Sequence, residues 1–321
     1  MVTSKCWILN KKHPDLPKAD DFKLITETLP ACSDNEFIVE AEWISVDPYI
    51  RIALTDQQLG SVITGGQVAR VIESKNLAYP VGSRVVGYFG WRTHTLLSDE
   101  IMARKSFGNL ENYKLFPEVE GLSHSTALGI LGMPGITAYY GFLEICDPKP
   151  GEVVLVNAAA GAVGSAVVQI AKIKGCKVIA LAFTVYWILI NLLIVPGVNC
   201  YFDNVGGRFS AKAFPLLAEF ARVSVCGAIA NYNDRSKSLD HDYLCSPYAE
   251  SLINWKQVRI EGFMVTRWSA RWREGVQQMR EWIDQGKMKY SETITEGFEN
   301  TPQAFIGLFH GDNSGKAVIK V

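Results

Sequence analysis

Hydrophobic and polar positions follow two different patterns along the chain, and the change lies near Ser123. Before it, short apolar runs such as Phe37–Val39, Val68–Ile72 and Arg84–Tyr88 are separated by Gly, Pro and Asn, which is typical of β-strands and turns. Gly82 precedes one of these runs, where we expect a tight turn. After Ser123, helical segments alternate with short apolar runs, which predicts a parallel, doubly wound α/β sheet.

The second pattern predicts a specific series of elements. Helices are expected over Ser125–Leu131 and Ile136–Cys146. Strands are expected at Val153–Asn157, Val178–Leu181, Cys200–Asp203, Arg222–Cys226 and Ile260–Val265. Near the end of the chain we expect a helix over Pro302–His310 and a strand over Lys316–Val321, which rejoin the first domain.

The length of the chain predicts two domains, because 321 residues exceed one ordinary hydrophobic core. We place the first domain in residues 1–122 and 291–321 and the second in residues 123–290. The second domain is the one expected to contain the parallel sheet.

One region departs from the alternating pattern, because no charged residue occurs between Val178 and Phe202. An apolar run longer than about eighteen residues is formally a transmembrane candidate. However, Val178–Leu181 is needed as a sheet strand and Pro196–Gly197 interrupts the run, so we favour two buried strands joined by an apolar connector. A βαβ unit needs about thirty residues, so we also expect that one strand–helix unit is missing here.

The expected strand Val153–Asn157 leads directly into a turn of small residues and then a helix start. In the G-x-G-x-x-G frame of dinucleotide-binding proteins, Ala159, Gly161 and Gly164 take the three glycine positions. A turn without bulky side chains lets backbone N–H groups approach a pyrophosphate, and the helix dipole favours the negative charge. The sequence therefore predicts a dinucleotide site, although such turns also occur where a helix packs tightly on a strand.

The cofactor type stays open from these residues. The acidic residue that binds the adenosine ribose is expected about twenty positions beyond the turn. That place holds Leu181–Thr184, which offers neither a carboxylate for NAD nor a basic group for NADP. Two strand ends, Asp203–Gly207 and Cys226–Ile229, are expected to line the nicotinamide side, but ordinary loop chemistry also explains their Asn and Gly residues.

Two tyrosines are candidates for donating a hydrogen bond to a developing enolate: Tyr232 and Tyr49. His94 and His124 are weaker candidates for proton transfer, because neither has a partner visible in the sequence. The histidines and cysteines form no cluster with metal-ligand spacing, so no metal site is expected.

Charge and cysteine usage exclude several classes of protein. The 32 basic and 33 acidic residues nearly balance, which argues against nucleic-acid binding and against a polybasic membrane patch. The 7 cysteines are scattered singly, as in reduced cytosolic proteins, and Met1–Lys5 contains no apolar stretch typical of a signal peptide. We therefore expect a cytoplasmic enzyme.

Several motifs together resemble the zinc-free members of the medium-chain dehydrogenase/reductase family. These motifs are Val46–Arg51, Met133–Tyr139, Asn157–Ser165, Tyr201–Gly207, Cys226–Ile229, Glu296–Asn300 and Gly311–Asn313. Zinc-dependent relatives carry a Gly-His-Glu triplet where this chain has Gly65–Gly66–Gln67. The resemblance implies a GroES-like, β-rich catalytic domain and a Rossmann-type cofactor domain.

The resemblance also implies a reaction: NADPH-dependent reduction of the double bond of α,β-unsaturated ketones and aldehydes, including eicosanoid enones such as 15-oxoprostaglandins. Hydride would pass to the β-carbon and give an enolate, with Tyr232 near the nicotinamide ribose and the enolate oxygen and Tyr49 near the substrate. By motif match, the cofactor would be held by Thr137, Gly161, Ala162, Val163, Gly164, Asn204, Cys226, Gly227, Ala228, Ile229, Tyr232, Phe263, Met264, Val265 and Asn313. Family members pair as homodimers through the cofactor-domain sheet edge, for which Ile260–Val265 is available.

Two departures from the family pattern matter. The family has a longer segment after the second strand, whose Gly-Ser-x-x-Lys stretch supplies a lysine to the NADPH phosphate, and Phe183–Asn199 contains nothing similar. A lysine–phosphate contact contributes about 1.5–3 kcal/mol. Trp255 stands where the family's loop over the substrate often has a tyrosine. The alternative to an active reductase is therefore a non-catalytic or poorly folded family variant, such as a splice product, that acts at most as a binding protein.

Overall fold

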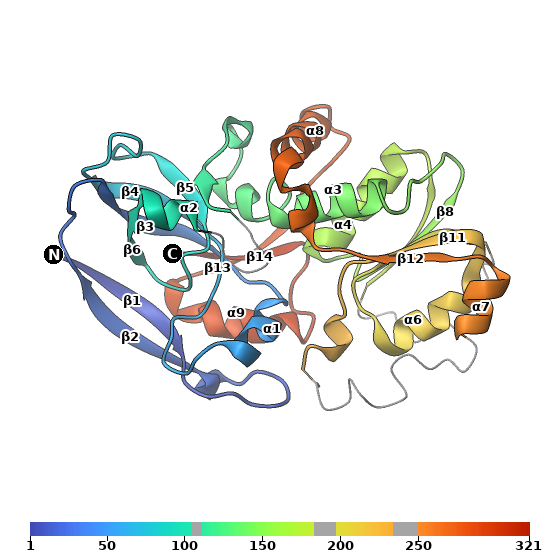
Figure 1. The fold of residues 1–321 in the computed structure, drawn as a ribbon, viewed down its shortest axis with the longest axis horizontal. Coiled ribbons are helices and arrows are strands. Elements are labelled where there is room, and N and C mark those ends of the chain that lie inside the picture. Colours follow the sequence, from blue (N-terminus) through green and yellow to red (C-terminus); the bar gives the residue numbers. More distant parts are fainter. Residues whose placement is uncertain (105–110, 183–196, 234–248) are drawn as a thin grey trace. The chain divides into compact units, whose positions relative to one another are not determined.

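The computed structural model describes residues 1–104, 111–182, 197–233 and 249–321 (Figure 1). The chain divides into two compact units, Met1–Gly129 with Glu292–Val321 and Ile130–Ser291. The first unit continues beyond the expected boundary at residue 122, because a 3₁₀ turn at His124–Leu128 packs against strands of its sheet.

The first unit is built on a seven-stranded sheet and a separate two-stranded hairpin. The hairpin consists of β1 (Val2–Leu9) and β2 (Phe22–Leu29), which pair in antiparallel fashion. The large sheet has the order β13-β14-β3-β4-β5-β7, and β6 pairs with β3. Its strands are β3 (Glu36–Ser45), β4 (Gln67–Ser74), β5 (Arg84–Gly87), β6 (His94–Ser98), β7 (Tyr113–Lys114), β13 (Glu292–Glu296) and β14 (Lys316–Lys320). The helices are α1 (Ile50–Asp56), α2 (Asp99–Ala103) and α9 (Thr301–Leu308).

The expected β-rich character of this unit is confirmed. The three apolar runs of the sequence lie in β3, β4 and β5, and Gly82 adopts the positive φ of 89° that its turn requires. The expected rejoining of the C-terminal segment is confirmed as well, because β14 pairs with β13 in parallel and with β3 in antiparallel fashion. The unit therefore has the GroES-like architecture that the motifs imply.

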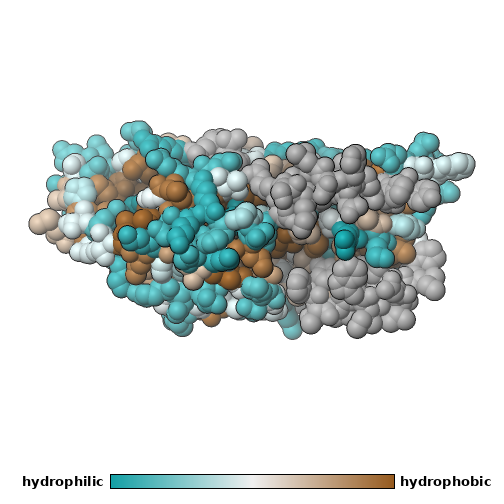
Figure 2. All heavy atoms as spheres, turned by 90° about the horizontal axis from the view of Figure 1, so that it is seen from below, coloured by the Kyte–Doolittle hydropathy of each residue, from teal (hydrophilic) through white to brown (hydrophobic). Residues whose placement is uncertain are grey.

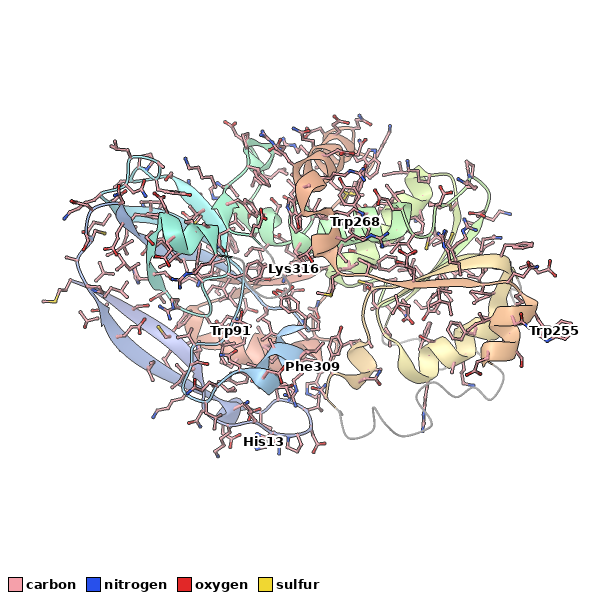
Figure 3. All side chains as sticks on the ribbon, in the orientation of Figure 1. His13, Trp91, Trp255, Trp268, Phe309 and Lys316 are labelled. Carbon is pink, nitrogen blue, oxygen red and sulfur yellow. The ribbon has the colours of Figure 1, made fainter. Side chains whose placement is uncertain are left out.

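Aromatic side chains from distant segments form the centre of the first unit's core. Trp91 is completely buried, and its ring centroid lies 5.6 Å from those of Phe22 and Phe305 (Figure 3). Phe22 comes from β2 and Phe305 from α9, so this cluster joins the start and the end of the chain. Edge-to-face and tilted pairs at such distances add about 0.5–1.5 kcal/mol each to the effect of burial.

The second unit is a five-stranded parallel sheet in the order β12-β11-β10-β8-β9. Its strands are β8 (Val153–Asn157), β9 (Lys177–Leu181), β10 (Val198–Asp203), β11 (Leu217–Val225) and β12 (Arg259–Gly262). Its helices are α3 (Met133–Leu143), α4 (Ala162–Ile173), α6 (Gly207–Ala213), α7 (Ala249–Trp255) and α8 (Trp272–Asp284). Figure 1 shows α3 and α4 over one face and α6 and α7 over the other, which is the doubly wound Rossmann-type arrangement.

Two predicted elements differ from the structure. The helix expected over Ser125–Leu131 is wrong: only a short 3₁₀ turn forms, and the next helix begins already at Met133 with Pro134 in its first turn. The strand expected to reach Val265 ends at Gly262, because Val265 begins a 3₁₀ segment. Local apolar spacing did not distinguish these turns from longer regular elements.

The uncharged run begins and ends in strands of the same sheet, β9 and β10, while residues 183–196 lie outside the described part of the chain. β10 is buried as expected, but β9 is not, since Ala180 is exposed and Ile179 only half-buried. Within the described residues no strand pairs with the outer side of β9. The expected loss of one strand–helix unit falls on residues outside the described part of the chain and stays a prediction. In this same set of residues, no helix has the length and apolarity needed to cross a membrane.

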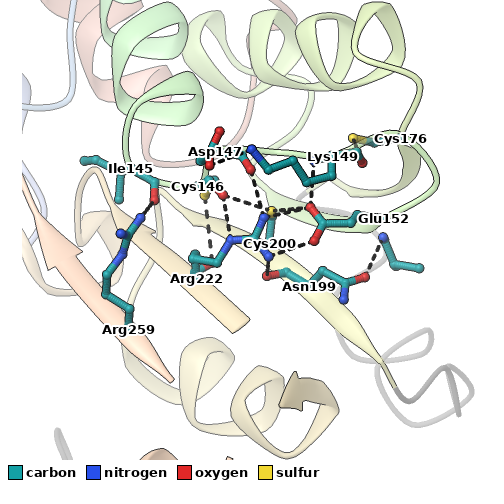
Figure 4. A network of polar contacts seen from close by, with 11 residues as sticks. Ile145, Cys146, Asp147, Lys149, Glu152, Cys176, Asn199, Cys200, Arg222 and Arg259 are labelled. Atoms are coloured by element: carbon teal, nitrogen blue, oxygen red, sulfur yellow. Dashed lines mark hydrogen bonds and ion pairs between the residues drawn. The ribbon is translucent and has the colours of Figure 1, made fainter. Parts of the chain in front are cut away.

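A bidentate ion pair links Arg222, on β11, to Glu152, which directly precedes β8 (Figure 4). The pair lies toward the amino ends of the strands, opposite the edge where such sheets bind ligands. The guanidinium of Arg222 donates to Oε1 of Glu152 over 2.9 Å and to Oε2 over 2.7 Å. Its Nε also donates to the carbonyl oxygen of Cys146 over 2.7 Å. Burial is the largest single influence on the pKa of Glu152 and raises it. The hydrogen bonds from Arg222 and from the N–H of Lys149, together with the charge of Arg222, nevertheless leave that pKa below its usual value.

Exposed hydrophobic residues do not form one continuous surface on the face drawn in Figure 2, where they make separate patches among hydrophilic residues. The second unit nevertheless exposes Ile260 and Met264 at and just after its edge strand β12, with 39% and 56% of their surface accessible. Trp255, at the end of α7, is 80% exposed (Figure 3). Its indole is therefore turned outward in this conformation.

Candidate functional site

The turn after β8 has the close backbone packing that a pyrophosphate site requires. A Cβ on Gly164 would lie 2.9 Å from the carbonyl carbon of Ala158, so only glycine lets α4 approach the strand this closely. At Gly161 a Cβ would meet a single atom, the oxygen of Ala158 at 3.2 Å. The first intrahelical bond runs from the N–H of Ser165 to the oxygen of Gly161, which leaves the preceding N–H groups without an intrahelical acceptor.

A buried side-chain network fixes the ends of β8 and β10, the neighbouring strands between which the strand order reverses. Nδ2 of Asn157 donates to Oδ1 of Asp203 over 2.7 Å and to the hydroxyl of Tyr201 over 2.8 Å. Ser210, on α6, donates to the other carboxylate oxygen of Asp203. Asn157 and Asp203 are 0% and 4% exposed, so both act inside the protein.

The same network shapes the loop that was expected to line the nicotinamide side. The N–H groups of Val205 and Gly206 donate to Oδ1 of Asp203 over 3.0 and 2.9 Å. Asn204 is tied to Asn157 twice, through its own N–H (2.7 Å) and its Nδ2 (2.9 Å). Asp203 therefore holds the loop in place, and Asn204 is half-buried at the carboxyl end of β10.

The next turn, Cys226–Tyr232, packs onto this loop. The N–H groups of Cys226 and Gly227 donate to the oxygen of Asp203 over 2.8 and 3.1 Å, and that of Ile229 donates to Asn204 over 3.3 Å. Burial raises the pKa of Cys226 to about 12, so its thiol is not a nucleophile at neutral pH. The hydroxyl of Tyr232 accepts a hydrogen bond from the N–H of Ala228 over 3.3 Å. The side chain of Tyr232 therefore folds onto the backbone of the Cys226–Tyr232 turn.

Other residues assigned to the cofactor by motif have structural contacts. The hydroxyl of Thr137 donates to the oxygen of Met133 over 2.7 Å, one turn earlier in α3. The ring of Phe263 packs so closely on Gly141 that a Cβ there would lie 2.8 Å from it. Met264 is exposed to solvent, whereas the side chain of its neighbour Val265 is buried in the protein.

In the first unit, Tyr49 is half-buried and immediately precedes α1. Tyr88, which follows β5, is half-buried as well. Burial raises the pKa of both phenols well above the usual value, and the negative charge of Asp47 adds to this effect. Both side chains therefore remain protonated over the physiological range.

Asp47 is itself held by the last strand of the chain. Nζ of Lys316 lies 3.2 Å from Oδ1 of Asp47 and donates to the carbonyl oxygens of Val46 and Ala317 over 2.8 and 2.7 Å. Ser45 donates to the second oxygen of the carboxylate. Burial lowers the pKa of Lys316, although Asp47 counteracts this. Nothing in the sequence pattern pointed to this ion pair, because its partners lie on β14 and on the segment after β3.

The remaining candidates of the first unit are engaged locally. Nδ2 of Asn313 donates to the oxygen of Gly315 over 2.9 Å. Nε2 of His94 lies 3.8 Å from Glu40, and Nδ1 of His124 lies 3.4 Å from Glu42. These contacts support structural roles for both histidines.

One group in the described residues has the composition of a metal site, namely His13, Asp20 and Asp21 (Figure 3). Its carboxylates are already engaged, since Asp20 pairs with Lys11 over 2.8 Å and Asp21 accepts from the N–H of Lys18 over 2.9 Å. At the position of the zinc-binding triplet, Nε2 of Gln67 donates to the oxygen of Arg92 over 3.0 Å.

Comparisons with known proteins agree with this geometry. Residues 5–104 match a family described as the N-terminal domain of oxidoreductase. Prostaglandin reductase 1 from Bos taurus is 41% identical over 100% of both chains. The chain belongs to the prostaglandin reductase family, in the zinc-free branch of the medium-chain reductases.

Two further relatives extend this family assignment. The NADPH-dependent curcumin reductase of Escherichia coli is 33% identical over 98% of this chain and 96% of its own. The crystal structure of CurA from Vibrio vulnificus in complex with NADPH has a TM-score of 0.84 and 31% identity, with 99% of each chain covered. This prostaglandin reductase family member thus shares its whole described fold with an NADPH-binding relative.

Sequence reasoning missed residues that organise the candidate residues within each unit. Asn157 was treated only as the end of a strand, and Asp203 as a lining residue. The available signal was that Asn157 and Asp203 are polar residues at the ends of apolar strands. A buried polar group needs a hydrogen-bond partner, so these two residues could have been predicted to pair. Tyr88 and Lys316 gave no such signal, since tyrosine and lysine are common at half-buried and exposed positions.

Proposed function

We propose that this protein reduces the carbon–carbon double bond of α,β-unsaturated ketones and aldehydes, including eicosanoid enones such as 15-oxoprostaglandins, with NADPH as hydride donor. The full-length 41% identity to prostaglandin reductase 1 is the observation that carries the proposal. The curcumin reductase relative supports the same reaction class and the same cofactor. None of these observations supports the non-catalytic alternative.

The second unit fits a dinucleotide. The turn Ala158–Gly164 carries no large side chain, and the N–H groups of Ala162, Val163 and Gly164 are available at the start of α4. We assign the pyrophosphate to this turn, and the nicotinamide half to the loops at Asn204 and Cys226–Tyr232. Residues 183–196 lie outside the described part of the chain, so the adenosine half rests on the relatives alone.

When bound, NADPH supplies the hydride that forms the new C–H bond at the β-carbon and leaves as NADP⁺. The substrate gains two electrons, and the negative charge collects on its carbonyl oxygen as an enolate. A protonated phenol of the protein donates a hydrogen bond to that oxygen, and one proton from the protein or solvent completes the saturated product. Following the family motifs, we assign this role to Tyr232 and a place near the substrate to Tyr49.

Enone-dependent oxidation of NADPH by the purified protein tests the proposal. We expect turnover with an alkenal and with a 15-oxoprostaglandin, and hydride transfer to the β-carbon when deuterated NADPH is used. The 8 tryptophans should also report binding of NADPH and NADH by fluorescence. Binding of NADPH without turnover of any enone would overturn the reductase proposal, and absence of both would overturn the cofactor site too.

We further propose that the protein is a homodimer joined through β12. This strand is the edge of the parallel sheet within the described residues, and its Ile260 is exposed. An open strand edge with apolar side chains favours pairing with a second copy. Light scattering should show a dimer that Ile260→Lys converts to a monomer, whereas Leu77→Lys, at a fully exposed position of the first unit, leaves it intact.

A cytoplasmic location is proposed on chemical grounds. The six cysteines in the described residues are all free thiols, and four of them are buried. Reduced thiols of this kind suit a compartment that keeps glutathione reduced. Fractionation of cells with a tagged full-length protein tests the location, and recovery in a membrane or secreted fraction would contradict it.

A further inference from the structure

The segment Val46–Arg51 supplies only Tyr49 to the proposed reaction, although two charged residues of the same segment are buried. Asp47 is 5% exposed and Arg51 is 7% exposed, so each charge needs a partner inside the protein. They lie on either side of Tyr49 in the sequence, and Tyr49 itself packs against the hydrophobic core of the unit. The partners of these two charges therefore decide how firmly the backbone at Tyr49 is held.

Lys316 is the partner of Asp47, and the pairing of β14 with β3 brings it there. Val318 stands opposite Ser45. Lys316, two residues earlier, therefore comes opposite Asp47, just beyond the end of β3. Its Nζ lies 3.2 Å from Oδ1 of Asp47 and donates to the carbonyl oxygen of Val46 over 2.8 Å. Because Ser45 donates to the other carboxylate oxygen, both the side chain of Asp47 and the backbone before it are held.

Arg51 holds the other end of the segment. It lies on α1, and its Nη2 donates to the carbonyl oxygens of His13 and Asp15 over 2.8 and 2.6 Å. These two residues belong to the loop between β1 and β2, far from α1 in the sequence. Within the segment, the N–H of Ile50 donates to the carbonyl oxygen of Asp47 over 3.1 Å. The backbone that carries the tyrosine is thus fixed from both sides.

We infer that Lys316 and Arg51 are positioning residues for the enone, which act by holding Tyr49 in its place beside the substrate. This inference rests on the proposed function, which puts Tyr49 near the substrate. A buried ion pair adds little net stability, because the loss of hydration offsets the attraction between the charges. Such a pair can instead fix one conformation of the chain around it. A side chain that is already in place loses less conformational entropy when a ligand binds.

Removing the ion pair in two ways separates positioning from stability. Lys316→Met leaves the buried carboxylate of Asp47 without its cation, so the urea midpoint should fall. The double variant Asp47→Leu with Lys316→Met leaves neither charge buried, so its midpoint should lie closer to that of the wild type. We expect both proteins to raise the KM for an enone about tenfold, with kcat within about threefold of the wild type. The Kd for NADPH should stay unchanged, because the pyrophosphate turn belongs to the second unit.

Lys320→Met is the matched control, because Lys320 lies on the same strand and its pair with Glu296 is exposed. It should leave the KM within about twofold of the wild type. Arg51→Lys keeps the positive charge but replaces the guanidinium fork by a single ammonium group, so the KM should rise in this variant as well. In a Tyr49→Ala background, Lys316→Met should raise the KM no further. A merely structural defect would lower the active fraction equally in both backgrounds.

A second measurement does not depend on turnover. Replacing Tyr49 by 3-fluorotyrosine places a fluorine label on the residue that is held. The wild type and Lys320→Met should each give one narrow fluorine NMR resonance. Lys316→Met and the double variant should broaden or split this resonance, because the segment then samples more than one conformation.

An unchanged KM or an unchanged fluorine spectrum in the double variant would overturn the inference while leaving the proposed function intact. An equal rise of the KM on Lys316→Met in the wild-type and Tyr49→Ala backgrounds would also overturn it, because Lys316 would then act without Tyr49. A wild-type protein that turns over no enone would overturn the proposed function, and this inference with it.

Discussion

Asn157, at the end of β8, donates a hydrogen bond of 2.7 Å to Asp203, at the end of β10. The two strands are neighbours, and β9 lies on the other side of β8, so the bond spans the point where the strand order reverses. Open α/β sheets bind ligands in the crevice at that point. A buried network of hydrogen bonds therefore joins the carboxyl ends of these two strands.

Asn157→Leu should destabilise the protein by about 2–3 kcal/mol, because the buried carboxylate of Asp203 loses a donor. The N–H of Asn204 loses its bond to the Asn157 side chain at the same time, so the Kd for NADPH should rise. Urea denaturation and fluorescence titration measure the two effects.

Asn199→Ala is the matched control on the opposite end of β10, where one bond to the N–H of Val153 is lost. It should cost about 1 kcal/mol and leave NADPH binding unchanged. Equal effects of the two variants on binding would contradict this interpretation.

Gly161→Ala and Gly164→Ala should separate binding from folding. At Gly161 a Cβ would make one tight contact, 3.2 Å to a backbone oxygen, and would lie where the pyrophosphate is assigned. The variant should therefore lose little stability but bind NADPH at least about tenfold more weakly. At Gly164 the Cβ collides with backbone, so this variant should lose about 2 kcal/mol or more of stability. Thermal melting and titration distinguish them. Unchanged affinity in Gly161→Ala would place the cofactor elsewhere.

Arg222→Met should destabilise the second unit by about 2 kcal/mol, because Glu152 is left half-buried without its cation. The pKa of Glu152 lies below its unfolded value of 4.5, so its contribution is present above that pH and is lost as the pH falls through the lower folded value. The difference in the free energy of unfolding between wild type and variant should therefore shrink in acid.

The control variant Arg104→Met removes an exposed pair with Glu100 and should change stability by less than about 0.5 kcal/mol at every pH. A pH-independent loss in Arg222→Met would argue against the ion pair.

Glu292→Gln should stabilise the protein at neutral pH. Burial raises the pKa of Glu292, and its Oε1 is buried without a hydrogen-bond partner, while Ser125 donates to Oε2. The folded state therefore favours the protonated acid, which costs nothing below the unfolded pKa of 4.5 and becomes a penalty as the pH rises through the folded value. The gain from Gln should accordingly appear only above that window. Glu296→Gln, exposed on the same strand, should give no such gain. A Glu292→Gln protein less stable than wild type at pH 7 would contradict the argument.

The sequence predicted the second unit best where regular spacing and glycine chemistry agree. β8, the turn at Gly161 and Gly164, and α4 were all expected, because a small-residue turn between an apolar strand and an apolar helix has few other structures. The 3₁₀ turn at His124–Leu128 was not, since apolar spacing looks the same in a 3₁₀ turn and a helix. For Thr137 and Tyr232 the structure adds local hydrogen bonds, and the contact with a cofactor stays a prediction.

The contacts of the first unit could not be predicted, because they join segments at opposite ends of the chain. Lys316 and Asp47 are ordinary polar residues until β14 pairs with β3 and buries both. Tyr49 and Tyr88 also lie far apart in the sequence, Tyr49 in the segment after β3 and Tyr88 directly after β5. Local patterns carry no information on such pairings, which depend on the tertiary register of the sheet.

The position of β14 between β13 and β3 also determines the order in which the protein can be made. Synthesis proceeds from the N-terminus, and domains generally fold as units while the chain emerges. The second unit is complete once Ser291 has left the ribosome, but the first has to wait with its large sheet unfinished until residues 316–320 appear. The half that is translated first is therefore the half that finishes folding last, and a nascent chain stalled before β14 should expose its unfinished sheet to chaperones.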